Sequence, residues 1–154
     1  MIGLALSLVL AATAQEPLTE QCDLGGNTLQ INACAMAELE AETARMELYL
    51  EAARAQAQAR ARDAETGEAH GRQLRYLDAA QAAWESYADA VCEGVYDQWR
   101  EGTIRTVMAI GCRIDLTRQR TQVIWRNHLT HVDSTPPLLP EPVGPPRDGT
   151  EVER

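Results

Sequence analysis

Residues 27–66 read NTLQINACAMAELEAETARMELYLEAARAQAQARARDAET, a stretch of forty residues without glycine or proline. It is rich in Ala, Glu, Leu, Met, Gln and Arg, which have the highest helix propensities. Asn27 or Thr28 is a suitable N-cap, so the stretch predicts one long helix. Its expected buried stripe comprises Ile31, Ala35, Leu39, Met46, Leu50 and Ala53. From Gln56 to Ala61 the apolar positions thin out, and we expect that end to be exposed to solvent.

A second helix is predicted over residues 72–93, which follow a break at residues 67–71 and also lack glycine and proline. Apolar residues recur in it at spacings of three and four, the pattern of an amphipathic helix. The expected inner face comprises Leu74, Leu77, Ala80, Trp84, Tyr87, Ala88 and Val91. Gly94 and Gly102 predict that this helix frays or bends before the chain reverses.

A third helix is predicted to begin near Thr103 or Thr106 and to end near His131. Its expected inner face comprises Ile104, Val107 or Met108, Ile110, Ile114, Leu116 or Thr117, Val123 or Ile124, and Leu129. Gly111 is expected to mark a kink or a close approach needed by the Cys112 bridge. Three helices joined by short links predict an all-α fold, an antiparallel three-helix bundle.

Both ends of the chain differ in composition from the helical part. Residues 1–14, MIGLALSLVLAATA, predict a cleavable signal peptide, with the mature chain starting at Gln15. The apolar run is shorter than the roughly 20 residues that span a bilayer, so we expect no membrane insertion after cleavage. Residues 134–154 hold six of the seven prolines and predict a disordered tail, either solvated or bound by a proline-reading partner through residues 142–146. The helical domain would then occupy residues 15–133.

The four cysteines are Cys22, Cys34, Cys92 and Cys112. An even number of cysteines in a small exported chain favours disulfides, which persist in oxidising compartments such as the periplasm. Three pairings are possible, and the favoured one joins neighbours in sequence, Cys22 to Cys34 and Cys92 to Cys112. A zinc site is disfavoured because the spacings are 12, 58 and 20, with no Cys-x2-Cys pair.

Charge excludes one class of function. The chain has 154 residues, which suits one domain, and a formal net charge of −9 with arginine as its only basic residue besides histidine. Nucleic-acid binding needs clustered positive charge, so we expect no DNA or RNA partner. The acidity is segregated, however, because residues 102–131 hold five arginines and one aspartate.

Acidic residues recur along the second predicted helix, on the face expected to lie opposite its apolar face. They are Asp78, Glu85, Asp89, Glu93 and Asp97. This stripe has three interpretations: a solvated face, an internal contact with the arginines of the third helix, or a surface for an external cationic partner. Trp99 lies in the glycine-punctuated connection that follows and is the best candidate for a partner anchor, since binding hot spots favour Trp.

Signals of catalysis are missing from the sequence. It has no nucleophile elbow, phosphate-binding loop or metalloprotease helix, so we expect neither an enzyme nor a cofactor. His128 and His131 have a spacing that can place two imidazoles on one metal, with Asp133 nearby. Polar residues at a helix C-terminus explain the same pattern, and we predict no metal.

Residues 80–92, AQAAWESYADAVC, resemble the signature of the N-terminal domain of LprI-type lysozyme inhibitors. Two further segments resemble that family in the same order along the chain. They are Ile31-Asn32-x-Cys34-Ala35 upstream and Gly102-Thr103, Cys112, Leu116-Thr117 and Arg120 downstream. The resemblance covers roughly residues 20–130 and includes all four cysteines.

The resemblance implies a secreted, disulfide-bearing helical domain and, at family level, lysozyme inhibition. We therefore predict an exported, non-enzymatic binding protein that inhibits a cationic lysozyme by occlusion. In this prediction the acidic stripe attracts the enzyme and residues 94–102 block its cleft. The alternative is a periplasmic structural or protein-interaction module of the cell envelope without lysozyme activity.

Overall fold

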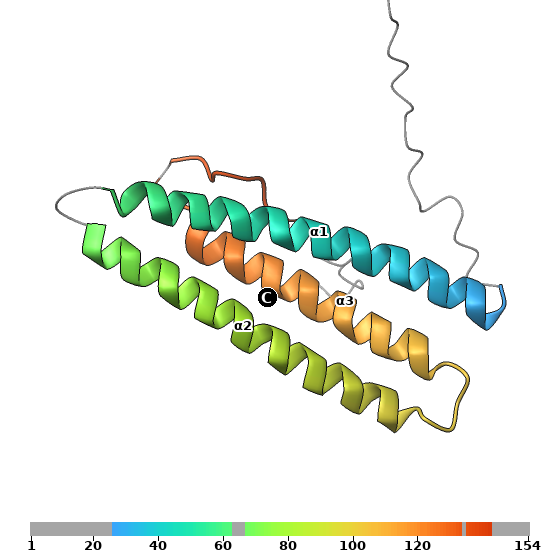
Figure 1. Cartoon of the computed structure of the whole chain (residues 1–154). Helices are drawn as coiled ribbons and strands as arrows, with labels where there is room; N and C mark the ends of the chain where they lie inside the picture. The colour runs from blue at the N-terminus through green and yellow to red at the C-terminus, as the bar shows by residue number, and fades with distance from the viewer. Residues whose placement is uncertain (1–25, 63–66, 134, 143–154) are drawn as a thin grey trace, which may run out of the picture.

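The computed structural model describes residues 26–62, 67–133 and 135–142. Three long helices, α1 (Thr28–Arg60), α2 (Gly67–Gln98) and α3 (Arg105–Ile124), are followed by a short π-helix, η2 (Trp125–Leu129). Sequential helices run antiparallel, and α3 packs along both α1 and α2 (Figure 1). The described residues contain no strand. The predicted all-α, antiparallel three-helix architecture is therefore confirmed.

The start of α1 is fixed by a capping box, which satisfies backbone N–H groups that have no partner inside the helix. The Asn27 side chain accepts hydrogen bonds from the backbone N–H groups of Leu29, at 3.0 Å, and Gln30, at 3.1 Å. The Gln30 side chain accepts in turn from the Asn27 backbone at 2.9 Å. Of the two predicted caps, Asn27 is the one used.

The core lies where the middle of α1 faces α2 and the end of α3. Its buried members are Met46, Tyr49, Leu50, Ala53, Leu77, Ile124 and Leu129. The predicted positions Met46, Leu50 and Ala53 are confirmed, whereas Tyr49 and Glu42 are buried without having been predicted. The expectation that residues 56–61 are exposed is wrong for Ala57, because α1 still packs against the bundle at that turn.

The predicted inner face of α2 needs correction. Tyr87 is 56% exposed, Val91 is 36% exposed, and Ala80 is also exposed. The positions that turn inward are Leu77, Gln81, Trp84, Ala88 and Cys92. Gln81 can be buried because its side-chain oxygen accepts a hydrogen bond from Arg120 Nε at 3.0 Å. Because this buried residue is polar, apolar periodicity does not predict the inner face of α2.

The helix α2 is also longer than predicted, since Gly71 and Gly94 both lie inside it. The prediction for α3 is closer: Ile110, Ile114, Thr117, Ile124 and Leu129 are buried, but Ile104 is 42% exposed at the start of the helix. The expected close approach at Gly111 is wrong, because an added Cβ there would meet nothing within 4 Å.

Residues 135–142, which we call the C-terminal strap, pack against the bundle (Figure 1). Trp125 Nε1 donates to the Leu139 carbonyl at 2.9 Å, and the Tyr49 hydroxyl donates to the Pro140 carbonyl at 2.8 Å. The Leu138 backbone N–H donates to the Leu129 carbonyl at 2.9 Å. The prediction of a disordered tail from residue 134 is therefore wrong for the strap, whereas residues 143–154 lie outside the described part.

One predicted disulfide is present, between Cys92 of α2 and Cys112 of α3, with 5.6 Å between the Cα atoms. Cys34 is also disulfide-bonded. Its predicted partner Cys22 lies outside the described residues, as does the predicted signal peptide, so the Cys22–Cys34 pair stays a prediction. None of the described helices combines the length and the apolar character that crossing a membrane requires.

Candidate functional site

The turn that joins α2 to α3 is held by side-chain and backbone hydrogen bonds. Arg105, at the start of α3, donates through Nε to the Tyr96 hydroxyl at 2.9 Å and through Nη1 to the Arg100 and Gly102 carbonyls at 3.2 and 3.3 Å. Its guanidinium also lies over the Tyr96 ring, 5.7 Å from the ring centre. The Gly102 N–H donates to the Trp99 carbonyl at 2.9 Å. Contacts within the chain thus hold the turn together.

Large apolar side chains are exposed around this turn. They are Tyr96, Trp99, Ile104 and Met108. Trp99, the predicted partner anchor, is 39% exposed. With the neighbouring carboxylates of Glu93 and Asp97, these four residues form what we call the hairpin surface. Of these four, only Trp99 was predicted from the sequence. Ile104, and Met108 as an alternative to Val107, were expected on the inner face of the third helix, and Tyr96 was not singled out, although it is one helical turn beyond Cys92.

The five carboxylates of the predicted stripe fall into two groups. Asp78 forms an ion pair with Arg54 of α1 at 2.7 Å, and Asp89 forms one with Arg113 of α3. The stripe therefore runs along the edge of the buried face rather than opposite it. Glu85 accepts a hydrogen bond from Gln81 at 3.1 Å. Glu93 and Asp97 are exposed and, within the described part of the chain, make no ion pair.

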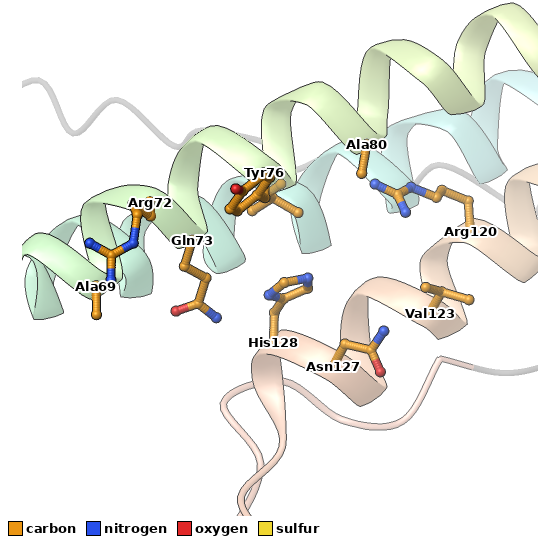
Figure 2. A pocket seen from close by; sticks show the side chains of 10 residues that line it. Ala69, Arg72, Gln73, Tyr76, Ala80, Arg120, Val123, Asn127 and His128 are labelled. Atoms are coloured by element: carbon orange, nitrogen blue, oxygen red, sulfur yellow. The ribbon is translucent and has the colours of Figure 1, made fainter.

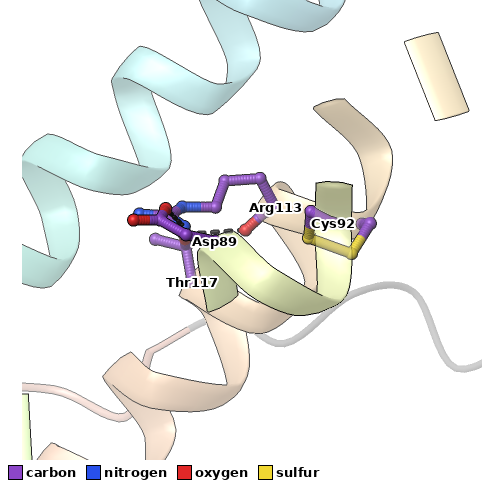
Figure 3. Close-up of a disulfide and its surroundings, with 5 residues drawn as sticks. Asp89, Cys92, Arg113 and Thr117 are labelled. Carbon is purple, nitrogen blue, oxygen red and sulfur yellow. Dashed lines mark hydrogen bonds and ion pairs between the residues drawn. A yellow bond between two sulfur atoms is a disulfide. The ribbon is translucent and has the colours of Figure 1, made fainter. Parts of the chain in front are cut away.

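Arg113 joins the acidic stripe to the core side of α2. Besides the Asp89 carboxylate, its guanidinium contacts the Trp84 ring, 5.3 Å from the ring centre. The Asp89–Arg113 pair lies about one helical turn from the Cys92–Cys112 disulfide (Figure 3). A covalent and an ionic link therefore hold α2 to α3 beneath the hairpin surface.

A groove of about 330 Å³ opens beside this linked region, between α2, α3 and Leu39 of α1. Asp89, Glu93 and Tyr96 line one side of it, and Ile110 and Arg113 line the other. Because Glu93 and Tyr96 also belong to the hairpin surface, the groove continues that surface along the bundle. The structure thus brings Asp89, Glu93, Asp97 and Trp99 to one end and leaves Asp78 well away from it.

The helices α1 and α3 are joined by Arg118. It donates to Glu38 at 2.5 Å and to Glu42 at 3.0 Å, and Glu42 is only 5% exposed. Burial alone would lower the pKa of Arg118, but the hydrogen bonds and charges of the two carboxylates outweigh it and raise the pKa. The prediction that arginines of the third helix pair with acidic residues of the other helices is therefore confirmed for Arg113 and Arg118.

A second pocket, of about 480 Å³, lies at the opposite end of the bundle, between the first half of α2 and the end of α3 with η2 (Figure 2). We call it the open-end pocket. His128 lines it together with Arg120, and neither residue touches the hairpin surface. Among residues 26–62, 67–133 and 135–142, no three His, Cys, Asp or Glu side chains gather as a metal site.

Fold and surface together define a class of protein: a small helical domain, bridged by a disulfide, with an exposed acidic and aromatic end suited to protein contact. Residues 20–123 match the model of the family described as lysozyme inhibitor LprI, and the chain belongs to this family. Over 124 residues, 76% of this chain and 87% of the relative, it is 33% identical to an uncharacterized protein of Rhizobium meliloti (strain 1021). No solved structure matches the chain.

Proposed function

We propose that the protein is an exported, non-enzymatic inhibitor that binds a lysozyme with its hairpin surface and covers the enzyme's cleft. Membership of the lysozyme inhibitor LprI family carries the proposal. Export is supported by the leader-like residues 1–14 and by the Cys92–Cys112 disulfide, since disulfides persist in oxidising compartments.

The hairpin surface supports occlusion because it combines a rigid turn with an exposed anchor. Trp99 protrudes from a turn that Arg105 holds through three hydrogen bonds. A preorganised loop loses little conformational entropy on binding, and Trp is among the residues that contribute most to protein interfaces. Trp99 is therefore the side chain that we propose enters the cleft.

Charge supports a cationic partner. The carboxylates of Glu93 and Asp97 have no internal cation in the described part of the chain, so their field extends into solvent at the same end as Trp99. Such a field speeds the encounter with an oppositely charged protein. Asp78 and Asp89 contribute less, because Arg54 and Arg113 compensate their charges.

The test combines the chain from Gln15 with a panel of purified lysozymes in a cell-wall lysis assay and measures complex formation by surface plasmon resonance. Trp99→Ala should weaken binding by about tenfold or more, the usual size for an interface hot spot. Tyr87→Ala, which removes a more exposed aromatic side chain of α2 outside the hairpin surface, should leave binding unchanged.

The electrostatic attraction of the enzyme is tested by the double variant Glu93→Gln with Asp97→Asn, which should associate more slowly at low salt. The matched control is Glu47→Gln with Glu51→Gln, two exposed residues of α1 at the same spacing. Full lysis in the presence of the protein, with no complex for any enzyme of the panel, contradicts the proposal. Capture of another envelope protein together with that result would favour the interaction module instead.

A further inference from the structure

The open-end pocket has a composition that differs from the rest of the molecule. The chain carries a net charge of −9, yet none of the described carboxylates lines this pocket. Its polar lining consists of two arginines, a histidine and two side-chain amides, and its apolar lining includes Tyr76, Leu77 and Val123. Its volume of about 480 Å³ lies in the range of small-molecule sites.

Arg120 is held in place without being neutralised. Its Nε donates to Gln81 at 3.0 Å, which fixes the side chain between α3 and α2 (Figure 2). Its Nη2 atom is buried and has no hydrogen-bond partner within the described part of the chain. Burial lowers the pKa of Arg120, because a cation without a counter-ion is destabilised there. An unpaired guanidinium donor inside the protein is costly, and a negative charge bound where Arg120 lines the pocket would stabilise this cation.

His128 lies in the same pocket and points toward α2 (Figure 2). Burial and the nearby charge of Arg120 lower its pKa, so the ring is neutral at pH 7 and offers one N–H donor. Arg72 lies on the opposite lip, where its ion pair with Glu68, at 2.8 Å, is at the surface. Such exposed pairs contribute little to stability, and Arg72 lies at the other end of the pocket from Arg120 (Figure 2).

We propose that the open-end pocket binds a small organic anion whose carboxylate lies against Arg120, at the opposite end of the pocket from Arg72 (Figure 2). The guanidinium donors match the oxygens of a carboxylate, and the ring or chain of the ligand packs against Tyr76, Leu77 and Val123. This site is at the other end of the bundle from the hairpin surface. The proposal is therefore independent of lysozyme binding.

The experiment titrates the chain from Gln15 with sodium benzoate and follows the His128 ring resonances by NMR. Benzamide has the same ring without the charge, acetate has the charge without the ring, and sodium chloride controls for ionic strength. We expect a saturable shift with benzoate, a weaker one with acetate, and none with benzamide or chloride. A benzamide response equal to that of benzoate, or no saturation with benzoate, would overturn the proposal.

Two variants separate the pocket from general charge effects. Arg120→Gln removes the guanidinium that meets the carboxylate and should weaken benzoate binding about tenfold, as expected for the loss of a hydrogen bond to a charged group. Arg75→Gln removes the same charge from an exposed position of α2 that does not line the pocket and should have no effect. Equal weakening by both variants would show non-specific attraction and contradict the proposal. Arg75 is exposed, and the loss of the Arg120 guanidinium breaks a hydrogen bond to a neutral amide, so circular dichroism should show that both variants are folded.

Discussion

Arginines nearer the hairpin and arginines nearer the open end of α3 have different partners. Arg113 and Arg118 each meet carboxylates that reach across from α2 or α1. Arg120, only two residues beyond Arg118, meets an amide and keeps a buried donor that has no partner among the described residues. A cation that is matched by a carboxylate fixes the helices to one another, whereas a cation that is not matched is available to a ligand.

Arg118→Met should have the largest effect on stability. It would leave the buried Glu42 carboxylate with its ion pair to Arg45, at 3.2 Å, but without its α3 partner. Breaking a buried ion pair from one side costs up to about 4 kcal/mol. Urea unfolding monitored by circular dichroism measures the change. Arg120→Met is the matched control and should cost much less, because Gln81 is neutral. Equal losses would remove the distinction between the two arginines.

Removal of the Cys92–Cys112 disulfide should have the next largest effect. The bond closes a loop with a sequence separation of 20, for which the chain-entropy model gives about 3 kcal/mol. The double variant Cys92→Ser with Cys112→Ser, unfolded in urea, tests this value. Benzoate binding at the open end should survive in the folded variant, and its loss would mean that the two ends are coupled.

The strap connects Tyr49 of α1 to Trp125 of η2 by hydrogen bonds, whereas the disulfide connects α2 to α3 near the hairpin. Tyr49→Phe removes the hydroxyl that donates to the Pro140 carbonyl and should cost about 1 kcal/mol. The same unfolding assay measures it. Tyr87→Phe, at an exposed site, is the control and should be neutral. If Tyr49→Phe were also neutral, the strap would contribute nothing through this bond.

Local features of the sequence were sufficient to predict the helices and much of the core. The stripe Met46, Leu50 and Ala53 follows from periodicity within α1, and the cap at Asn27 follows from residue type. The inner face of α2 was not predictable in this way, because Gln81 is buried through a hydrogen bond to a residue 39 positions away. Apolar periodicity selected Tyr87 and Val91 instead, which face solvent.

The sites show the same limit. The acidic stripe and Trp99 are visible in sequence, but which carboxylates are compensated depends on arginines 24 residues away, as for Asp78 and Asp89. Proline content indicated disorder from residue 134, yet Tyr49 and Trp125 hold the strap by hydrogen bonds. Composition alone does not predict such bonds between distant residues. The open-end pocket was missed because its cations come from separate helices.

The smallest predicted effect concerns pH and the open end. The pKa of His128 in the folded protein is lowered from 6.5, first by burial and then by Arg120, so the unfolded chain binds a proton more readily. The contribution of His128 to stability is therefore complete above about pH 6.5 and declines as the pH falls toward the lowered pKa.

Urea unfolding between pH 5 and 7.5 should show this decline, and His128→Gln should flatten it, whereas His70→Gln in α2 should not. An identical slope in both variants would assign the decline to other groups. Saturating benzoate offers a sharper version of the same measurement. An anion beside the ring stabilises the imidazolium and raises the pKa of His128 toward its unfolded value, so the wild-type slope should approach that of His128→Gln.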